Sequence, residues 1–118
     1  MTQHIEVGKM GENLAEVFLT GKGFVVKHRN WRHSHYEIDI IAEKNGIPHF
    51  IEVKTRTSTH FGKPEESITK KKINDLLRAA DAYMRYHPAY SDFRIDVLSI
   101  VQQAGKEPEY FFIEDIYC

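Results

Sequence analysis

The sequence predicts an α/β fold, a mixed β-sheet flanked by helices, formed by a single domain over residues 1–118. Apolar residues recur at helical spacing in two segments, while runs typical of strands occupy the segments between and after them. A strand, a helix and a strand in that order form a right-handed crossover, which makes the two strands parallel neighbours. At 118 residues, 42% of them hydrophobic, the chain is long enough to bury one core.

The first predicted element is a helix over about residues 6–19. Its apolar residues share one helical face, and two glycines then favour its end. These residues are Met10, Leu14, Val17, Phe18, Gly21 and Gly23. A strand is predicted next, from Phe24 toward Trp31, because the segment opens with the apolar run Phe24-Val25-Val26.

Two further strands are predicted over residues 36–42 and 50–57, and a strong turn signal separates them. Asn45-Gly46 is the dipeptide that two-residue hairpin turns prefer. The two strands are therefore expected to form a β-hairpin. Pro48 has no N–H to donate, so it favours a frayed or edge position at the start of the second of them.

The remaining predicted elements are a second helix over residues 66–86 and two strands. The apolar face of the helix consists of Ile73, Leu76, Leu77, Ala80 and Tyr83 or Met84, and Pro88 closes the helix. Residues 93–101 have apolar side chains on both strand faces, so this strand is expected to be central and covered on both sides. A fifth strand is predicted over residues 110–113.

The predicted hairpin brings polar residues together. If its turn has two residues, counting outward in step places Asp39 opposite Glu52. The same count places Glu37 opposite Lys54, and residues two apart share a face of the sheet. The other, core-facing side is then expected to hold Ile38, Ile40, Ile51 and Val53. A turn longer by two residues would keep the faces but shift the partners, and a bulge would break the register.

This polar face has the parts of a hydrolytic site. Two carboxylates as close as those of Asp39 and Glu52 repel each other unless a proton or a cation lies between them. Their oxygens suit Mg²⁺ or Mn²⁺, and a lysine such as Lys54 can orient water or neutralise a phosphate. Together these groups indicate phosphodiester hydrolysis. The alternative interpretation is a cross-strand salt bridge between Lys54 and either Glu37 or Glu52.

The net charge of −1 argues against a protein that coats nucleic acid by bulk electrostatics. The charge is unevenly placed, however: residues 22–33 hold four lysines or arginines and no acid, and residues 54–72 hold six against two acids. The tail after Gly105 is acidic. A local basic surface is therefore compatible with the near-neutral total, and solvated faces of ordinary elements are the alternative.

The expected compartment is the cytoplasm. The single cysteine is the terminal Cys118, so the chain has no internal disulfide framework. The first residues contain no apolar run of signal-peptide type, and no stretch is long enough to span a membrane.

Eight short motifs, spread in order over nearly the whole chain, match those of a known family. They are Gly11-Glu12-x-x-Ala15, Gly23-Phe24, Arg29-Asn30-Trp31-Arg32, Glu37-Ile38-Asp39-Ile40-Ile41-Ala42, Phe50-Ile51-Glu52-Val53-Lys54-Thr55-Arg56, Phe61-Gly62-x-Pro64, Ser67-Ile68-Thr69-x-x-Lys72 and Arg94-Ile95-Asp96-Val97. With them the chain resembles the YraN family of small bacterial proteins. That family belongs to the restriction-endonuclease-like PD-(D/E)xK superfamily and is similar to archaeal Holliday-junction resolvases.

The resemblance implies a restriction-endonuclease-like αβββαβ core with a metal-dependent active site. Asp39, Glu52 and the backbone carbonyl of Val53 match the metal ligands. Lys54 matches the lysine that activates water or stabilises the transition state. Glu12 aligns with the helix glutamate of the resolvases, which joins the acidic cluster from outside the sheet; an exposed helix residue is the alternative for it.

Three other matched residues are expected to contact the substrate or to stabilise the fold near this site. Lys72 and Arg56 are the candidates for contacts with nucleic-acid phosphates, although each has an alternative as a solvated surface residue. Asp96, on the predicted central strand, needs a polar partner and is expected to be structural. The sequence departs from the superfamily motif before Asp39, where Ile38 replaces the proline, as is usual for this family.

Two functions from different classes are compatible with the sequence. The first is a Mg²⁺- or Mn²⁺-dependent endonuclease that acts on DNA, branched or single-stranded, in repair or recombination. The second is a non-catalytic nucleic-acid-binding or protein-interaction module that retains the nuclease fold. A homodimer would suit a cut in two strands, an expectation that rests on the analogy with resolvases.

Overall fold

The computed structural model describes residues 2–57 and 68–116, and it describes side chains from residue 9 onward. The elements are α1 (Thr2–Gly21), β1 (Val25–His33), β2 (Tyr36–Lys44), β3 (Ile47–Arg56), α2 (Lys70–Tyr86), β4 (Arg94–Val101) and β5 (Glu109–Ile113). The predicted order of helices and strands is confirmed. Neither helix is long and apolar enough, over the residues described, to cross a membrane.

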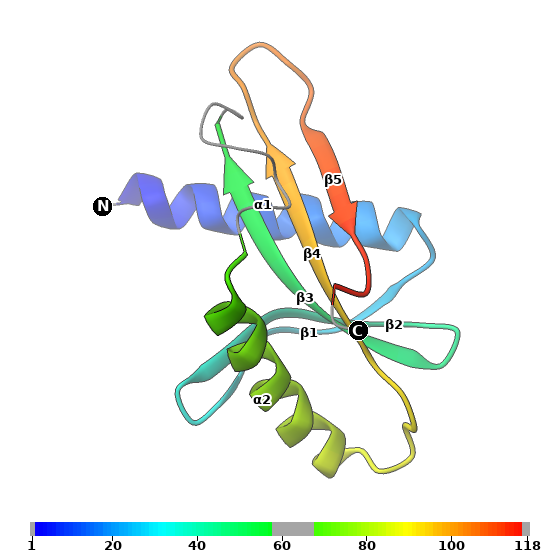
Figure 1. Cartoon of the computed structure of the whole chain (residues 1–118). Coiled ribbons are helices and arrows are strands. Elements are labelled where there is room, and N and C mark those ends of the chain that lie inside the picture. The colour runs from blue at the N-terminus through cyan, green and yellow to red at the C-terminus, as the bar shows by residue number, and fades with distance from the viewer. Residues whose placement is uncertain (1, 58–67, 117–118) are drawn as a thin grey trace.

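The five strands form one mixed sheet in the order β1-β2-β3-β4-β5 (Figure 1). The chain passes from β3 through α2 to β4, and these two strands are parallel, as the crossover rule predicts. The other neighbours are antiparallel. The predicted α/β class, with a mixed sheet flanked by helices, is therefore confirmed.

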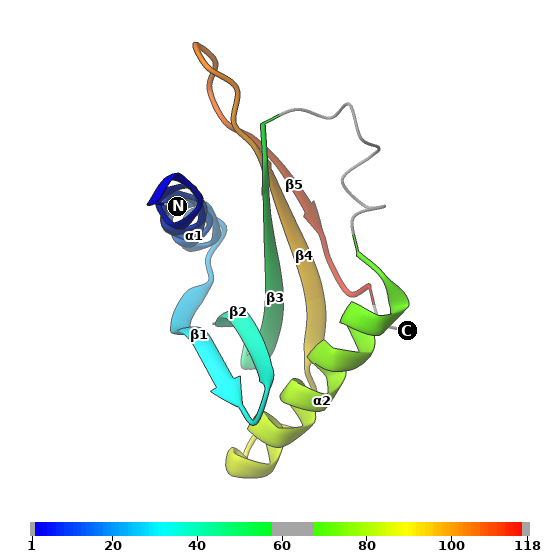
Figure 2. The ribbon, with the colours of Figure 1, turned by 90° about the vertical axis from the view of Figure 1, so that its left-hand side faces the viewer.

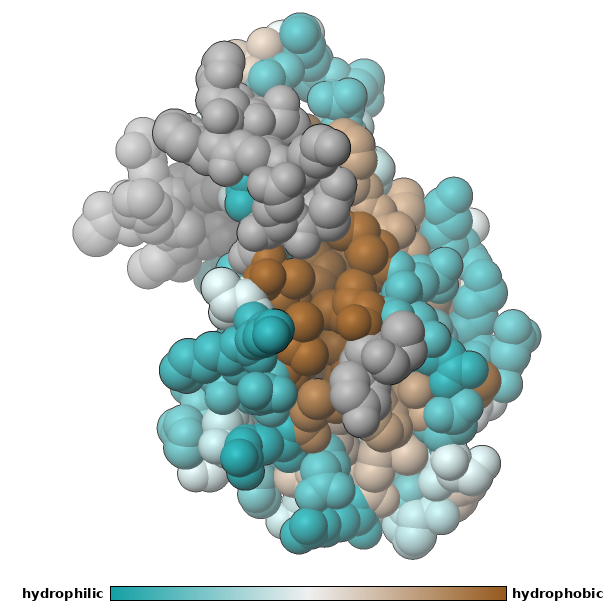
Figure 3. All heavy atoms as spheres, in the orientation of Figure 1, coloured by the Kyte–Doolittle hydropathy of each residue, from teal (hydrophilic) through white to brown (hydrophobic). Residues whose placement is uncertain are grey.

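The two helices lie on opposite faces of the sheet (Figure 2). Under α1 the buried residues are Ala15, Leu19, Phe24, Ile40, Ala42, Ile51, Leu98 and Ile100. Under α2 they are Ile38, Ile41, Phe50, Leu76, Ala79, Ala80, Tyr83 and Ile95. β4 contributes to both cores, which confirms that it is central and covered on both sides. Figure 3 looks onto the α2 face and shows apolar residues gathered at its centre, flanked by hydrophilic ones.

The β2–β3 hairpin has the predicted two-residue turn. Asn45 and Gly46 both have positive φ, 53° and 77°, as the favoured hairpin turn requires. Lys44 pairs with Ile47 across it. Pro48 pairs with β2, but the ladder to β4 begins one residue later, so its missing N–H falls where β3 has a neighbour on one side.

The second helix begins later than predicted. Residues 66 and 67, where the sequence places its start, lie outside the described residues, and α2 begins at Lys70. Thr69 is the cap, because its side-chain oxygen accepts a hydrogen bond from the Lys72 N–H at 3.1 Å. The apolar periodicity extends on the N-terminal side of this cap to Ile68, which is why the pattern alone overestimates the length of the helix.

β2 separates from β3 halfway along the predicted pairing. The ladder ends at Ile40 opposite Ile51, while β2 stays paired with β1 as far as Tyr36. In Figure 1, β1 and β2 run across the view whereas β3 and β4 rise steeply, which shows the twist that separates them.

This separation corrects two expectations. Ile38 does not share a side with Ile40; it packs in the core under α2, whereas Ile40 packs under α1. Glu37 does not face Lys54; it pairs with Arg32 on β1, with 3.5 Å between Arg32 Nη2 and Glu37 Oε2. Both errors come from extending a flat register into a region where the two strands diverge.

Candidate active site

The point where β2 leaves β3 holds Asp39 and Glu52. Asp39 immediately precedes Ile40, the first residue of β2 that pairs with β3, and its Oδ2 accepts a hydrogen bond from the Val53 N–H at 2.8 Å. A side-chain carboxylate thus takes the position that a backbone carbonyl would occupy if pairing continued. Glu52 precedes Val53 on β3 and is buried. The predicted proximity of Asp39 and Glu52 is present, through this contact and not through regular pairing.

The two carboxyl groups interact strongly. The pKa of Asp39 is raised from 3.8 to about 7, first by burial and then by the negative charge of Glu52. A hydrogen bond with the Glu52 side chain raises it further, whereas the Val53 N–H and the charge of Lys72 lower it. The pair therefore holds a proton under conditions where an exposed aspartate has lost it.

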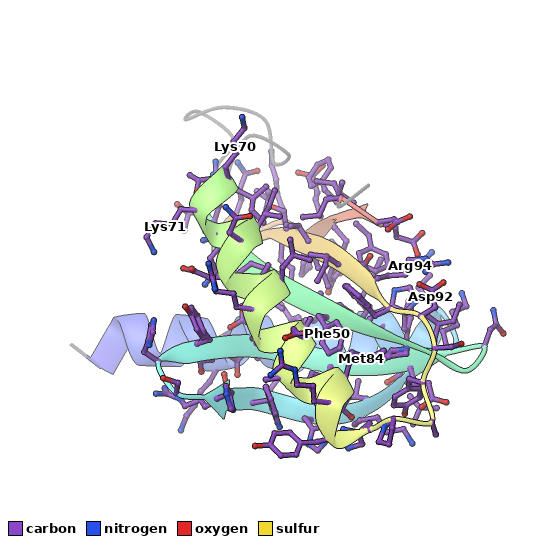
Figure 4. All side chains as sticks on the ribbon, turned by 60° about the horizontal axis from the view of Figure 1, so that its bottom comes forward. Phe50, Lys70, Lys71, Met84, Asp92 and Arg94 are labelled. Carbon is purple, nitrogen blue, oxygen red and sulfur yellow. The ribbon has the colours of Figure 1, made fainter. Side chains whose placement is uncertain are left out.

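Two lysines from different elements flank Glu52. Lys54 Nζ lies 3.4 Å from Glu52 Oε2, and Lys72 Nζ lies 3.6 Å from Oε1. The salt bridge that the sequence offered as an alternative for Lys54 is thus present, and it is made with Glu52. Lys72 reaches the acidic pair from the first turn of α2. Its neighbours Lys70 and Lys71 project from that turn away from the sheet (Figure 4).

Glu52 also has an unsatisfied oxygen. Its Oε1 is buried and has no hydrogen-bond partner among the described residues, since Lys72 lies beyond hydrogen-bonding distance. Buried carboxylate oxygens without a partner are rare and call for an explanation such as an ion. The carboxylates of Glu52 and Asp39 lie next to each other and share a proton. Their oxygens suit a divalent cation, which would take the place of that proton.

A third acidic ligand is not assembled with this pair. Over the described residues, no three acidic, histidine or cysteine side chains are gathered in a way that could hold a metal ion. Glu12 contacts β1 instead: its Oε1 accepts hydrogen bonds from Arg29 at 3.2 Å and from Asn30 at 3.1 Å. Arg29 is bound to Glu16 as well. The role of Glu12 in a metal site remains a prediction.

Arg56 lies on the same strand as Glu52 and Lys54, on the same face by alternation, and is half-buried. The described residues contribute no ion-pair partner to its guanidinium group. Asp96 has the polar partner expected of it: its Oδ2 lies 2.6 Å from His49 Nδ1, and its Oδ1 accepts the Asp115 N–H. Asp96 is therefore structural and lies on the α1 face.

The motifs do not single out Ser99, although the structure places it beside the site. It pairs with Lys54 in the β3–β4 ladder, and its fully buried hydroxyl has no hydrogen-bond partner in the described part of the chain. The signal for it in the sequence is one polar residue within the apolar run of residues 97–101. Arg29, which holds Glu12, is also absent from the predicted site.

Comparisons with known proteins agree with the motif resemblance. A family model described as "Uncharacterised protein family UPF0102" matches residues 11–100. A UPF0102 protein of Bacteroides thetaiotaomicron is 42% identical over 105 residues, which cover 89% of this chain and 87% of the relative. One from Phocaeicola vulgatus is 41% identical over 98% of this chain and 93% of its own. One from Syntrophomonas wolfei is 41% identical over 86% and 89%. None of these names states an activity.

Proposed function

The chain belongs to the uncharacterised protein family UPF0102, and from this premise we propose that it is a metal-dependent nuclease that hydrolyses phosphodiesters of DNA. The proposed substrate is branched or single-stranded DNA in repair or recombination, and the proposed cofactor is Mg²⁺ or Mn²⁺. One observation carries the proposal: Asp39 and the buried Glu52 lie together beside two lysines, and one Glu52 oxygen has no hydrogen-bond partner among the described residues.

Asp39 and Glu52 would hold the cation, with the Val53 carbonyl as a third candidate ligand. When bound, the cation would stabilise negative charge on the phosphate and lower the pKa of a water molecule. Lys54, on the same strand face, is placed to orient the attacking water and to neutralise the charge that develops on the phosphate as the ester bond breaks. Lys72 adds a second positive charge from the other side of Glu52.

The basic residues near the pair support an anionic substrate. The first turn of α2 contains Lys70, Lys71 and Lys72 and no acid, and the N-terminus of a helix favours negative charge. Arg56 extends the positive charge along β3. These groups lie on the same face of the sheet as the acidic pair, so a phosphate backbone is expected to run along this face.

The direct test is cleavage of branched and single-stranded DNA in the presence of Mn²⁺. We expect Asp39→Asn and Glu52→Gln to reduce the rate by about 100-fold or more, as loss of a group that stabilises the transition state does. Asp81→Asn is the matched control, because Asp81 is an exposed carboxylate on α2 that pairs with Arg85. Cleavage that persists equally in all three variants would contradict the assignment of the site.

Metal binding can be measured apart from turnover. Mn²⁺ should raise the melting temperature of the wild type and of Asp81→Asn, and it should leave that of Asp39→Asn unchanged. A protein that shows this shift but no cleavage would keep the metal site and leave the substrate to be found. Equal shifts in all three proteins would place the metal elsewhere.

A second candidate is a non-catalytic nucleic-acid-binding module that retains the nuclease fold. The observation that favours it is the engagement of Glu12 by Arg29 and Asn30, which leaves the acidic pair without a third acidic ligand among the described residues. Tight binding of DNA that needs no metal, with no cleavage by the wild type, would support this candidate. Such binding should weaken steeply as salt rises, because phosphate contacts release counterions.

A further inference from the structure

A concave site lies on the face of the sheet opposite the Asp39–Glu52 pair. It is a cavity of about 370 Å³, within the usual size range of small-ligand sites, roughly 300–1,000 Å³. The residues that line it are Phe18, Lys22, Phe24, Lys44, Tyr110, Phe112 and Glu114. Their rings pack against the core under α1, whereas Glu52 faces Lys72 of α2. The two sites therefore share no residue.

The wall of this cavity is aromatic. Phe18 stacks on Tyr110 with ring centroids 4.7 Å apart, and Phe112 meets the edges of Phe18 and Phe24 at 5.9 and 5.8 Å. Tyr110 and Phe112 are two residues apart on β5, so they share its α1 face. The fold thus gathers four rings from the end of α1, the start of β1 and the edge strand.

Two lysines are held at this aromatic wall without an acidic partner. Lys22 Nζ lies 5.4 Å from the ring centroid of Phe18, and Lys44 Nζ lies 5.2 Å from that of Phe24. No carboxylate of the described part of the chain lies within ion-pair distance of either ammonium group. Glu114 is the one acid among the lining residues, so the cavity carries a net positive charge.

We propose that this cavity binds a nucleotide with a terminal phosphate monoester, either free or at the end of a nucleic-acid strand. An aromatic base matches the partly exposed rings of Phe18, Tyr110 and Phe112, since stacking on aromatic side chains is tolerant of base identity. A phosphate monoester has close to two negative charges, which two ammonium groups neutralise. The Glu114 carboxylate accepts a hydrogen bond from an amino group of the base or a hydroxyl of the sugar.

The lysines can be released from the rings at little cost. A cation–π contact of a solvent-accessible lysine is weak compared with a charge-assisted hydrogen bond to phosphate. The ligand therefore exchanges two weak contacts for two stronger ones and leaves ring surface for the base. The inference rests on the residues of this cavity alone and does not depend on the proposed nuclease activity.

The test is a titration of the full chain with thymidine 5′-monophosphate, followed by two-dimensional ¹H–¹⁵N NMR in EDTA without added metal. We expect saturable shifts of the amide signals of residues 22–24, 44 and 110–114. Lys22→Gln and Lys44→Gln should each weaken binding by about tenfold or more, the loss expected for one charge-assisted hydrogen bond. Lys27→Gln, an exposed lysine of β1 outside the cavity, is the control and should bind as the wild type does.

Further probes measure how much the nucleoside and the phosphate each contribute to binding, and whether the ligand is a free nucleotide or a strand end. Thymidine and inorganic phosphate, each offered alone, should bind more weakly than the monophosphate. A 5′-phosphorylated oligonucleotide that binds more tightly than the free nucleotide identifies a strand end as the ligand, and the reverse order identifies the free nucleotide.

Three results would overturn the inference: no saturable binding of either phosphorylated probe, equal affinity in the lysine variants, or shifts confined to residues around Asp39 and Glu52. Asp39→Asn should bind thymidine 5′-monophosphate as tightly as the wild type. Loss of cleavage in that variant with retained nucleotide binding distinguishes the two sites. Conversely, a wild type that cleaves DNA but binds no nucleotide here refutes the second site and leaves the first intact.

Discussion

Asp39 shows how one residue acquires unusual chemistry from its place in the sheet. It lies where β2 stops pairing with β3, so its carboxylate, and not a carbonyl, accepts the Val53 N–H. This position buries the group next to Glu52 and raises its pKa to about 7. A carboxyl group with a pKa near 7 can give up its proton near neutral pH, as the proposed binding of a divalent cation requires.

The first prediction concerns the pH dependence of stability without metal. The folded protein binds the Asp39 proton up to pH of about 7, whereas the unfolded chain releases it near the ordinary value of 3.8. The stability contributed by this group is therefore fully present below pH 3.8 and is lost as the pH rises through 7. Asp39→Asn removes this loss and should increase the free energy of unfolding at pH 8 by up to about 4 kcal/mol relative to the wild type.

Denaturant unfolding in EDTA at pH 5 and pH 8 checks this prediction. The stabilisation by Asp39→Asn should be larger at pH 8 than at pH 5. Glu37→Gln is the control on the same strand, because Glu37 pairs with the exposed Arg32; it should change stability by less than about 1 kcal/mol at either pH. A stabilisation that is independent of pH would contradict the raised pKa.

At the scale of the elements, the contact between α1 and β3 depends on one missing side chain. A Cβ atom at Gly11 would lie 2.2 Å from Thr55 Oγ1, closer than any real contact. Glycine is normally unfavourable inside a helix, by about 0.5–1 kcal/mol relative to alanine. Its presence here allows α1 to lie directly on the strand that holds Glu52 and Lys54.

The second prediction is therefore that Gly11→Ala destabilises the protein, by about 1–3 kcal/mol, although the same change favours an isolated helix. Gly21→Ala is the matched control: Gly21 lies at the end of the same helix, where an added Cβ would meet no other described element within 4 Å, so the change should be neutral or stabilising. Thermal unfolding monitored by circular dichroism measures both.

A double variant tests whether contact with Thr55 is the reason that Gly11→Ala destabilises the protein. The nearest atoms to the new Cβ all belong to the Thr55 side chain, so Thr55→Ala should recover part of the stability lost in Gly11→Ala. Independent, additive effects of the two substitutions would show that the close packing of α1 on β3 is not the reason for the glycine.

At the scale of the whole molecule, a buried polar contact joins segments far apart in the sequence. Asp96 on β4 is fully buried, and its two oxygens meet His49 of β3 and the Asp115 N–H beyond β5. Next to this contact, the Ile116 N–H donates to the Ile95 carbonyl at 2.8 Å. Asp96 thus ties β3, β4 and the segment after β5 together on the face of the sheet opposite the acidic pair.

The third prediction is that Asp96→Ala costs about 3–5 kcal/mol of stability, because it leaves the His49 ring and the Asp115 N–H without their partner. Asp75→Ala, which breaks the exposed pair with Lys71, is the control and should cost less than about 1 kcal/mol. Equilibrium unfolding measures both.

A double-mutant cycle isolates the contact itself. The loss in His49→Ala combined with Asp96→Ala should be smaller than the sum of the two single losses, since each single variant already breaks the same bond. Strict additivity would mean that the two residues act independently in spite of the 2.6 Å between them.

The sequence by itself determined the element order, the two-residue turn at Asn45-Gly46 and the parallel pairing of β3 with β4. These features depend on local backbone preferences and on periodicity, both of which are written along the chain. It also predicted that Asp39 and Glu52 lie close together, because counting from the turn places them one step beyond Ile40 and Ile51, the last pair of the ladder. The need of Asp96 for a partner was predictable on general grounds, because buried polar groups are almost always hydrogen-bonded.

Only the tertiary structure decided where that register ends and which side chains meet beyond its end. The twist of the sheet separates residues 36–39 of β2 from β3, moves Ile38 to the opposite core and pairs Glu37 with Arg32. The choice of Arg29 as the partner of Glu12, the burial of Ser99 and the aromatic cavity likewise depend on distant parts of the chain. Such contacts are set by packing and sheet twist over the whole molecule, and no local pattern in the chain encodes them.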